Sequence, residues 1–391
     1  MGIPWDDFVL IEDGKSPGDP TVVTVNCPDK TGLGCDLCRI VLEFGLYVAR
    51  GDFSTDGRWC YIVLWVIPRP SSLRIDWESL KNRLLSACPS CLPSFYLTEL
   101  SNRSSVTPFY LLKVFSVDRK GLLNDVTSVL CELELTLQKV KVMTTPDDKV
   151  LDLFFITDGM DLLHTKKRRE EACEHLRVVL GEDCISCELQ LAGPEYESQQ
   201  GLSSLSEAVA EDLFSCELFD KEACSQALSR DMSKVKKAAV TVDNFLSPIA
   251  YGRFSPSVKG HRSLDLFIQT KDGKKIVDHE DQAALCSRLK EEMLHPLRVT
   301  ITNRGPDTEL LVANPVELSG KGRPRVFYDV ACALKKLGIC VFSAEIGRHS
   351  TSDRQWEVYK FRLDESREFP LASNRAKSEI VDRVRKTLMG W

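Results

Sequence analysis

The chain has 391 residues, a formal net charge of −6 and 43% hydrophobic residues, enough for roughly two to four globular domains that each bury a core. This mild acidity, with one short basic run at residues 166–169, excludes nucleic acid as an expected partner. No apolar run could span a bilayer and the start resembles no secretion signal, so we expect no membrane partner. Fifteen cysteines then predict reduced thiols in the cytoplasm, with the nucleus as the alternative.

The first module begins after residues 1–19, which mix Pro, Gly and Asp and are predicted to form an arm. A β-branched run leads into the turn Asp29-Lys30-Thr31-Gly32-Leu33, which opens a helix with apolar residues at helical spacing. Gly45 ends that helix as a C′ glycine, and Asp76 is expected to cap a second helix. The predicted strands are 21–26, 46–54, 59–67 and 95–100.

The same design returns 89 residues later (118 − 29) as Asp118-Arg119-Lys120-Gly121-Leu122, without a gap as far as Asp36 and Asp125. A fixed offset over a supersecondary unit indicates tandem modules. Both modules follow the order β-α-β-β-α-β, which is the ferredoxin-like split βαβ unit. The strands expected in the second module are 110–117, 150–157 and 184–191, with another between its first helix and its hairpin.

The third module is incomplete. Leu264-Asp265-Leu266-Phe267 repeats Leu151-Asp152-Leu153-Phe154 of the second module, and a strand over 297–302 is expected to close the unit. Only six residues separate Val242 from Ile249, whereas the other modules use about twenty-five residues there for the turn and first helix. We therefore expect the first strand and helix to be missing at this point.

The fourth module carries Asp329 where the earlier modules carry Asp36 and Asp125, and Gly338 where the first carries Gly45. Its expected strands are 310–313, 340–348 and 356–363, and its last helix is 373–388, with no closing strand. The predicted division is an arm (1–19), the first module (20–101), the second module (108–191), a linker with a short helix (192–234), the truncated third module (235–304) and the fourth module (305–391).

Four units with an Asp-x-x-Gly-Leu turn resemble ACT domains. The tandem array and the stretches 240–244 and 322–329 are similar to the plant ACT-domain-repeat (ACR) proteins, and so to the carboxyl-terminal regulatory part of bacterial GlnD. The resemblance implies an α+β fold of tandem ferredoxin-like (βαββαβ) ACT modules, three whole and one partial, with amino-acid binding by paired domains. We hypothesise that the short third module is an alternatively spliced or mispredicted product.

The Asp-x-x-Gly turn suits a free amino acid. Its glycine lets the backbone approach, the helix N-terminus offers N–H groups to a carboxylate, and its aspartate can accept from an ammonium. The alternative is that the aspartate only caps the helix. In the fourth module Gly322 and Arg325 replace both features, which favours a structural turn. The expected ligand-binding residues are Asp29, Gly32, Leu33, Asp118, Gly121 and Leu122.

No group of catalytic or metal-ligating residues accompanies these turns. The sequence has no phosphate-binding glycine loop and no HExxH motif. Its CxxC pairs (Cys35/Cys38, Cys88/Cys91 and Cys184/Cys187) are too far apart for a zinc ribbon. We therefore expect neither enzyme activity nor a cofactor nor a metal.

The sequence predicts a non-catalytic regulatory protein that binds a free amino acid, with glutamine as the first candidate, in amino-acid or nitrogen signalling. The alternative is an interaction scaffold or regulatory subunit that has no small ligand and binds a target enzyme or its own copies. The first and second modules are expected to pair as one platform.

Overall fold

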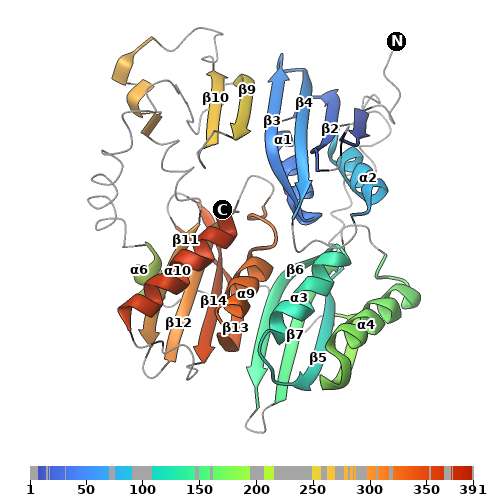
Figure 1. Ribbon diagram of the computed structural model, residues 1–391, viewed down its shortest axis with the longest axis vertical. Coiled ribbons are helices and arrows are strands. Elements are labelled where there is room, and N and C mark those ends of the chain that lie inside the picture. The colour runs from blue at the N-terminus through green and yellow to red at the C-terminus, as the bar shows by residue number, and fades with distance from the viewer. Residues whose placement is uncertain are drawn as a thin grey trace. The chain divides into compact units, whose positions relative to one another are not determined.

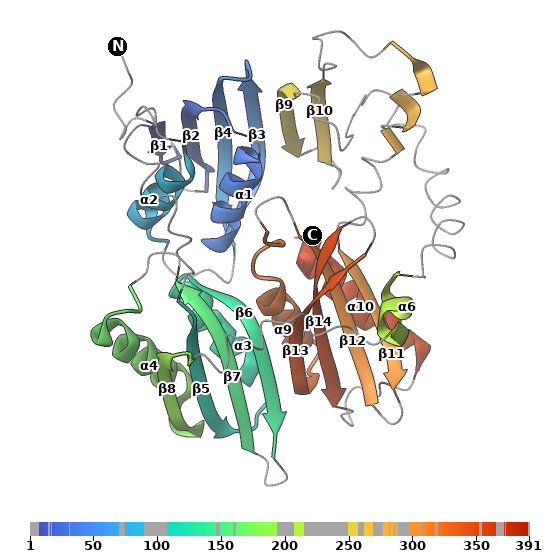
Figure 2. The same ribbon diagram turned by 180° about the vertical axis from the view of Figure 1, so that it is seen from behind.

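The chain folds into two compact units, each built on one antiparallel sheet (Figures 1 and 2). Unit 1 comprises Met1–Arg103 and Lys221–Pro296, and unit 2 comprises Ser104–Asp220 and Leu297–Trp391. The computed structural model describes residues 8–89 (without 15, 17, 31 and 70–74), 108–193 (without 146–148 and 159–161), 207–214, 249–256, 262–268, 277–287 (without 281 and 285) and 297–389 (without 305–306, 317–319, 352–353, 365–370 and 372).

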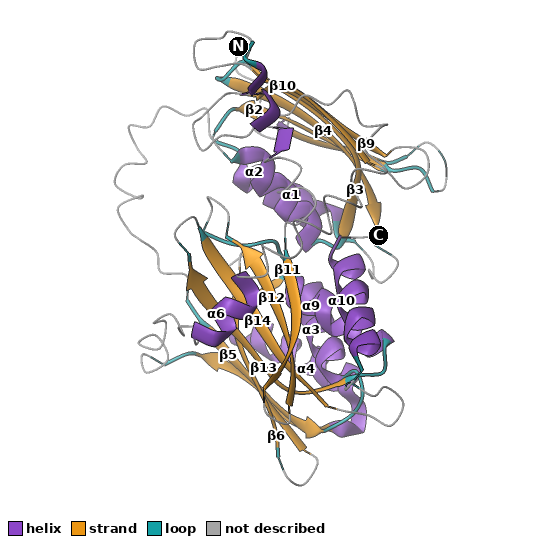
Figure 3. Cartoon of the chain, turned by 90° about the vertical axis from the view of Figure 1, so that its left-hand side faces the viewer, coloured by secondary structure: helices purple, strands orange, loops and turns teal. Residues whose placement is uncertain are grey.

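Unit 1 contains a six-stranded sheet in the order β1-β2-β4-β3-β9-β10. Helices α1 and α2 cover one face (Figure 3). The strand β2 alternates buried and half-buried side chains along its whole length, as a strand with one covered face should. The elements are β1 (Val9–Glu12), β2 (Thr21–Pro28), α1 (Leu33–Glu43), β3 (Leu46–Thr55), β4 (Trp59–Pro68), α2 (Trp77–Ala87), β9 (Ile249–Pro256) and β10 (Arg262–Ile268).

Unit 2 contains an eight-stranded sheet in the order β11-β12-β14-β13-β6-β7-β5-β8. Four of its helices lie on one face and α6 lies on the other (Figure 3). The elements are β5 (Tyr110–Val117), α3 (Leu122–Glu132), β6 (Leu135–Thr144), β7 (Lys149–Asp158), α4 (Lys166–Leu180), η2 (Gly181–Asp183), β8 (Cys184–Leu191), α6 (Glu207–Phe214), β11 (Arg298–Arg304), β12 (Asp307–Pro315), α9 (Val326–Lys336), β13 (Cys340–Ser350), β14 (Gln355–Asp364) and α10 (Asn374–Met389).

The predicted α+β class and the βαββ order of the modules are confirmed. Asp76 caps α2 by accepting a hydrogen bond from the Ser79 N–H (3.0 Å). Gly45 has a positive φ of 73° just after α1, as expected for the glycine that ends a helix. Local periodicity and capping chemistry therefore place most element boundaries to within two residues.

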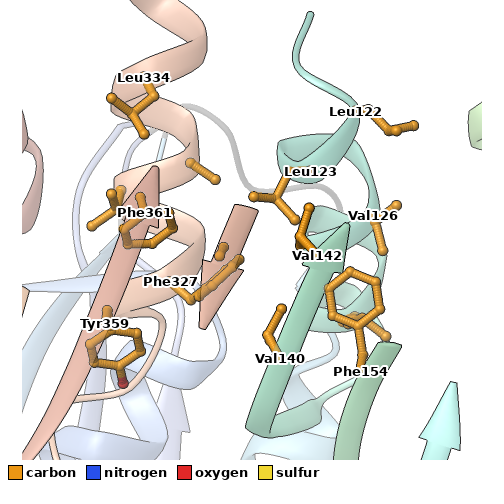
Figure 4. Packing of buried hydrophobic residues seen from close by; sticks show 14 of the residues in the cluster. Leu122, Leu123, Val126, Val140, Val142, Phe154, Phe327, Leu334, Tyr359 and Phe361 are labelled. Carbon is orange, nitrogen blue, oxygen red and sulfur yellow. The ribbon is translucent and has the colours of Figure 1, made fainter. Parts of the chain in front are cut away.

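The second and fourth modules form one continuous sheet because β6 pairs antiparallel with β13. Val142 lies opposite Ala344 at this junction, and both side chains are buried. Helices α3 and α9 are in contact above the strands, and Figure 4 shows the layer of apolar side chains between them and the sheet, including Val142, Phe154 and Phe361. The expected pairing of the first module with the second is wrong in this respect.

The first module instead joins its sheet to the third, through β3 and β9. Four residue pairs form this ladder, from Gly51 opposite Phe254 to Ser54 opposite Tyr251. The third module contributes only β9 and β10 to the described sheet. The region 215–248, where its first strand and helix were expected to be missing, lies outside the described residues, as does the strand expected at 95–100.

Two edge strands differ from the prediction. Val9–Glu12 is not part of an arm, because it pairs antiparallel with β2 along Val22–Val25. Arg298–Arg304 does not close the third module, because it pairs with β12 of the fourth. In the first and fourth modules, a strand that precedes the module pairs with the module's first strand at the edge of the sheet. In the second module β8 fills this edge position. The fourth module therefore needs no closing strand at its carboxyl end.

The linker also contributes structure. Val209 and Leu213 of α6 are buried against Leu311, Ala313 and Trp356, on the sheet face opposite the other helices. The part of the predicted linker beyond Phe214 lies outside the described residues.

Candidate functional site

The two Asp-x-x-Gly turns have nearly the same backbone. Gly32 and Gly121 are the N-cap residues of α1 and α3, with φ of 84° and 81°, which is the left-handed region that glycine enters without steric cost. Neither helix has a side-chain cap. In both helices the N-cap position is occupied by the glycine, and Asp29 and Asp118 lie three residues before it.

The repeated first-turn aspartate of each helix has a structural role that the sequence did not reveal. It pairs with a cation placed six residues earlier, beside the turn, and so ties the turn to its helix. These pairs are Lys30–Asp36 (3.1 Å), Arg119–Asp125 (2.7 Å) and Arg323–Asp329 (3.0 Å).

A cavity of about 30 Å³ lies beside the second module's turn. It is walled by both modules of unit 2, since side chains of α3, β6 and β7 face others from α9 and β13. The predicted site residues Asp118, Gly121 and Leu122 all line it. Among the other lining residues are Leu123, Asn124, Val142, Asp152, Leu334, Lys335, Ile339 and Cys340.

Asp152 is the most unusual group in this wall. Its side chain is 1% exposed, and neither carboxylate oxygen has a hydrogen-bond partner. The Nδ2 of Asn124, another wall residue, is also buried and without a partner. Burial, with a smaller contribution from the charge of Asp118, raises the pKa of the Asp152 carboxyl to about 8.

Lys335 of α9 lies across the turn of the second module. Its ammonium is 2.6 Å from Oδ1 of Asp125, and its alkyl chain passes so close to Gly121 that a Cβ there would lie 2.7 Å from Lys335 Cε. This side chain is 43% exposed. A flexible, half-exposed side chain therefore forms the outer part of the cavity wall.

The first module's turn differs in its surroundings. Thr55 Oγ1 donates a 2.5 Å hydrogen bond to Oδ2 of Asp29, so this carboxylate already has a donor within its own module. No described residue lies within 4 Å of a Cβ built on Gly32. Asp29, Gly32 and Leu33 are thus brought together by the turn, but no wall from a neighbouring module is described beside them.

The fourth module's turn is filled by its own side chains. Asn314 donates to the Arg323 carbonyl (3.0 Å) and accepts from the Arg323 N–H (3.1 Å). A Cβ on Gly322 would lie 2.3 Å from Asn314 Nδ2 and 2.7 Å from Glu357 Oε2. Arg325 adopts a left-handed φ of 63°. This geometry fits the structural role expected for the turn.

The cysteines offer no metal centre in the described part of the chain, where no three His, Cys, Asp or Glu side chains are grouped to hold an ion. Cys35 is exposed and Cys38 is half-buried on α1, while Cys91 lies outside the described residues. Cys27 and Cys60, which belong to none of the CxxC pairs, have Sγ atoms 3.9 Å apart across β2 and β4. None of the described helices combines the length and apolar character that a membrane span requires.

Comparison with known proteins gives three family matches. Residues 11–89 match the N-terminal domain of ACT domain-containing protein ACR10, residues 238–307 match the ACR9-like, ACT-like domain, and residues 308–390 match the C-terminal domain of ACT domain-containing protein ACR9. A crystal structure of an unknown protein from Galdieria sulphuraria covers 44% of this chain and 97% of its own at 16% identity. Its TM-score of 0.19 is too low to support an argument.

Two relatives from Arabidopsis thaliana match along their whole length. ACT domain-containing protein ACR9 is 64% identical over 420 residues, and ACT domain-containing protein ACR10 is 47% identical over 426, with 100% of both chains covered each time. The first alignment exceeds the 391 residues of this chain by 29 positions. That excess is similar in size to the turn and helix expected to be missing from the third module. The chain belongs to the plant ACT-domain-repeat (ACR) family.

Proposed function

We propose that this ACR protein is a non-catalytic regulatory protein that binds a free amino acid between its second and fourth modules, in amino-acid or nitrogen signalling. One observation carries the proposal: the cavity beside Asp118 and Gly121 is lined from two modules and contains an unpaired buried carboxylate, Asp152. Buried polar groups are almost always hydrogen-bonded, so an unsatisfied pair of oxygens beside a cavity indicates a missing binding partner.

The chemistry of the wall fits a zwitterion. The Leu122 N–H donates to the Arg119 carbonyl (3.2 Å). The N–H groups of Leu123 and Asn124, the next two in α3, have no acceptor within the helix and lie at its positive dipole end, which suits a carboxylate. Asp118 and Asp152 suit an ammonium. An amino acid would be held between the helix N-terminus and these carboxylates, with Leu334 and Ile339 from the fourth module beside it.

The cavity has to widen for the ligand. A volume of about 30 Å³ holds on the order of two water molecules, less than any amino acid needs. Lys335 is the wall residue with the greatest freedom to move, because it is half-exposed and unbranched. We therefore expect its ammonium to leave Asp125 as the ligand enters, while Arg119 continues to neutralise that carboxylate.

Thermal unfolding with a panel of the twenty amino acids, glutamine first, tests the proposal. A ligand at one hundred times its Kd should stabilise the protein by about 2.7 kcal/mol, or roughly 5–10 °C for a unit of this size. Asp118→Ala should abolish the shift. Asp29→Ala, the matched change in the first module, should leave it intact.

The second candidate function is an interaction scaffold that binds a target enzyme or its own copies, without a small ligand. It predicts no shift with any amino acid and a stable co-purifying protein instead. The described cysteines are all free thiols, which supports the cytoplasm as the proposed compartment.

A further inference from the structure

Asp152 occupies a core position that the fold does not require to be charged. It lies on β7 opposite Val114 of β5 and Val142 of β6, among inward-facing residues. Val25 of the first module corresponds to Val114, because the two lie 89 residues apart. The residue opposite Val25 is the apolar Ile62, so Ile62 occupies the position of Asp152. A carboxylate at this position is therefore a special feature of the second module.

The fourth module shows how the same position is satisfied when it is polar. Asp125 of α3 and Asp329 of α9 are equivalent positions, and Val142 and Ile346 follow them by the same number of residues. Val142 therefore corresponds to Ile346, which lies opposite Tyr359. The Tyr359 hydroxyl donates a 3.0 Å hydrogen bond to Glu357. Asp152 has no such partner on either oxygen, so its acceptors remain available to whatever enters the cavity.

The charged groups around Asp152 do not neutralise it. The nearest one that shifts its pKa is Asp118, a like charge from the β5–α3 turn. The cations of the wall are held elsewhere, because Arg119 pairs with Asp125 and Asp183, and Lys335 pairs with Asp125. The titratable residue that β13 contributes to the wall is Cys340, next to the apolar Val341. Because no described cation lies beside it, Asp152 holds a proton at neutral pH, as its raised pKa of about 8 indicates.

We infer that Asp152 is the ammonium-binding residue of this cavity and that it gives up its proton to solvent when a ligand with a primary ammonium group enters. The inference rests on the proposed function and makes it specific. The ligand brings one positive charge, the carboxyl loses one proton, and the buried pair that results is neutral. Binding then releases up to one proton and strengthens as the pH rises towards 8.

The specificity follows from the same charge balance. A compound with the carboxylate but without the ammonium, such as a 2-hydroxy acid or an N-acetylated amino acid, cannot compensate an ionised Asp152. It would have to bind beside the neutral acid and would release no proton. The cavity should therefore discriminate strongly in favour of free α-amino acids.

Isothermal titration calorimetry of the full chain tests the inference. The probe is L-glutamine in the first instance, and otherwise the amino acid with the largest shift in the thermal panel. Titrations at pH 6.5 in two buffers of different ionisation enthalpy should give close to one proton released per ligand. The affinity should rise about tenfold between pH 6 and pH 7 and level off above pH 8.

Two variants and one analogue sharpen the result. Asp152→Asn should fold, bind at least tenfold more weakly at pH 8 and release no proton. Asp29→Asn, in the first module's turn, should release the same number of protons as the wild type. The N-acetylated form of the probe should bind at least a hundredfold more weakly than the probe.

The outcomes separate the two proposals. An amino acid that binds at pH 6.5 without proton release, or that binds Asp152→Asn as tightly as the wild type, overturns this inference and leaves amino-acid binding standing. If Asp152→Asn does not fold, the number of protons that the wild type releases on binding is sufficient to support or overturn the inference. A panel in which no amino acid binds overturns both proposals.

Discussion

The second module's turn and the first module's turn share a backbone but differ in what faces them. Gly121 and Gly32 have φ within a few degrees of each other. Gly121, however, is covered by Lys335 from the fourth module, whereas no described residue approaches the open side of Gly32. The strand position beside each turn differs too, because it is the apolar Ile62 in the first module and Asp152, whose carboxylate oxygens have no hydrogen-bond partner, in the second.

This comparison teaches that the turn motif alone does not make a site. The cavity of unit 2 exists because the fourth module supplies the end of α9 and the start of β13. In unit 1 the described part of the third module supplies β9 and β10, and neither corresponds to α9. Among the described residues, the cavity of unit 2 therefore depends on a neighbouring module that contributes its first helix.

The largest expected effect concerns the stability of unit 2 as a function of pH. Asp152 has a pKa of about 8 in the folded chain, against an ordinary value of 3.8 for an aspartate, so the folded state binds its proton more tightly than the unfolded state does. The stability associated with that proton is complete below pH 4 and is lost as the pH rises through 8. The total is on the order of 5 kcal/mol.

Asp152→Asn cannot ionise and should escape this loss. Its melting temperature without ligand should match that of the wild type near pH 4 and exceed it by on the order of 10 °C at pH 8. Thermal unfolding followed by circular dichroism across this range measures the difference. A constant difference between the two proteins at every pH would show that Asp152 does not titrate in this window.

A smaller loss should follow from disrupting the junction of the second and fourth modules. Ala344→Arg places a charge at a 1% exposed position opposite Val142 and should cost about 3–5 kcal/mol, as an uncompensated buried charge does. Glu345→Gln, one residue further, removes only an exposed pair with Lys360 and serves as the control. Urea midpoints that agree for the two variants would contradict the observed pairing of β6 with β13.

The two turn glycines provide a more modest comparison. Gly32→Ala and Gly121→Ala each force a left-handed alanine, at about 1–2 kcal/mol. Gly121→Ala also adds a methyl group to the wall of the cavity, which Gly121 lines, so it should weaken ligand binding, while Gly32→Ala should not. The thermal shift with saturating ligand measures both. Equal loss of binding in the two variants would place the ligand at neither turn in particular.

The smallest effect is expected at Lys335. Its ion pair with Asp125 is 43% exposed on the lysine side, and such pairs contribute about 0–1 kcal/mol. Lys335→Ala should therefore leave the melting temperature nearly unchanged but speed ligand association, because the side chain no longer has to move. Lys335→Met, which keeps the alkyl chain, should associate at an intermediate rate in stopped-flow measurements. Identical rates for all three proteins would exclude a gating role.

The sequence predicted the parts of the fold that are encoded locally. Apolar spacing and the Asp76 cap located the helices, and the repeated turn revealed the modules. The edge strands were misassigned because the sequence of a short strand such as Val9–Glu12 does not indicate which strand it pairs with. The pairing of modules was missed for the same reason, since nothing local in β3 or β6 specifies the strand that pairs with its outer edge, and distant contacts decide the pairing.

Three of the six predicted ligand-binding residues line the cavity proposed as the site. Asp118, Gly121 and Leu122 do line the cavity, since the turn chemistry is local. Lys335 and Cys340 could not be found before the pairing was known. Asp152 was visible only as a repeat marker, although one signal was present: an aspartate in the inward-facing series Val150, Asp152, Phe154 and Ile156 of a buried strand.

Hydrogen exchange of the full chain with and without saturating L-glutamine, or the panel amino acid with the largest shift, tests the central claim most directly. Binding between the second and fourth modules predicts slower exchange of the amides at 121–124 and at 337–341 together, with those at 32–36 unchanged. Protection at 32–36, or at 121–124 without 337–341, would contradict a site shared by the two modules.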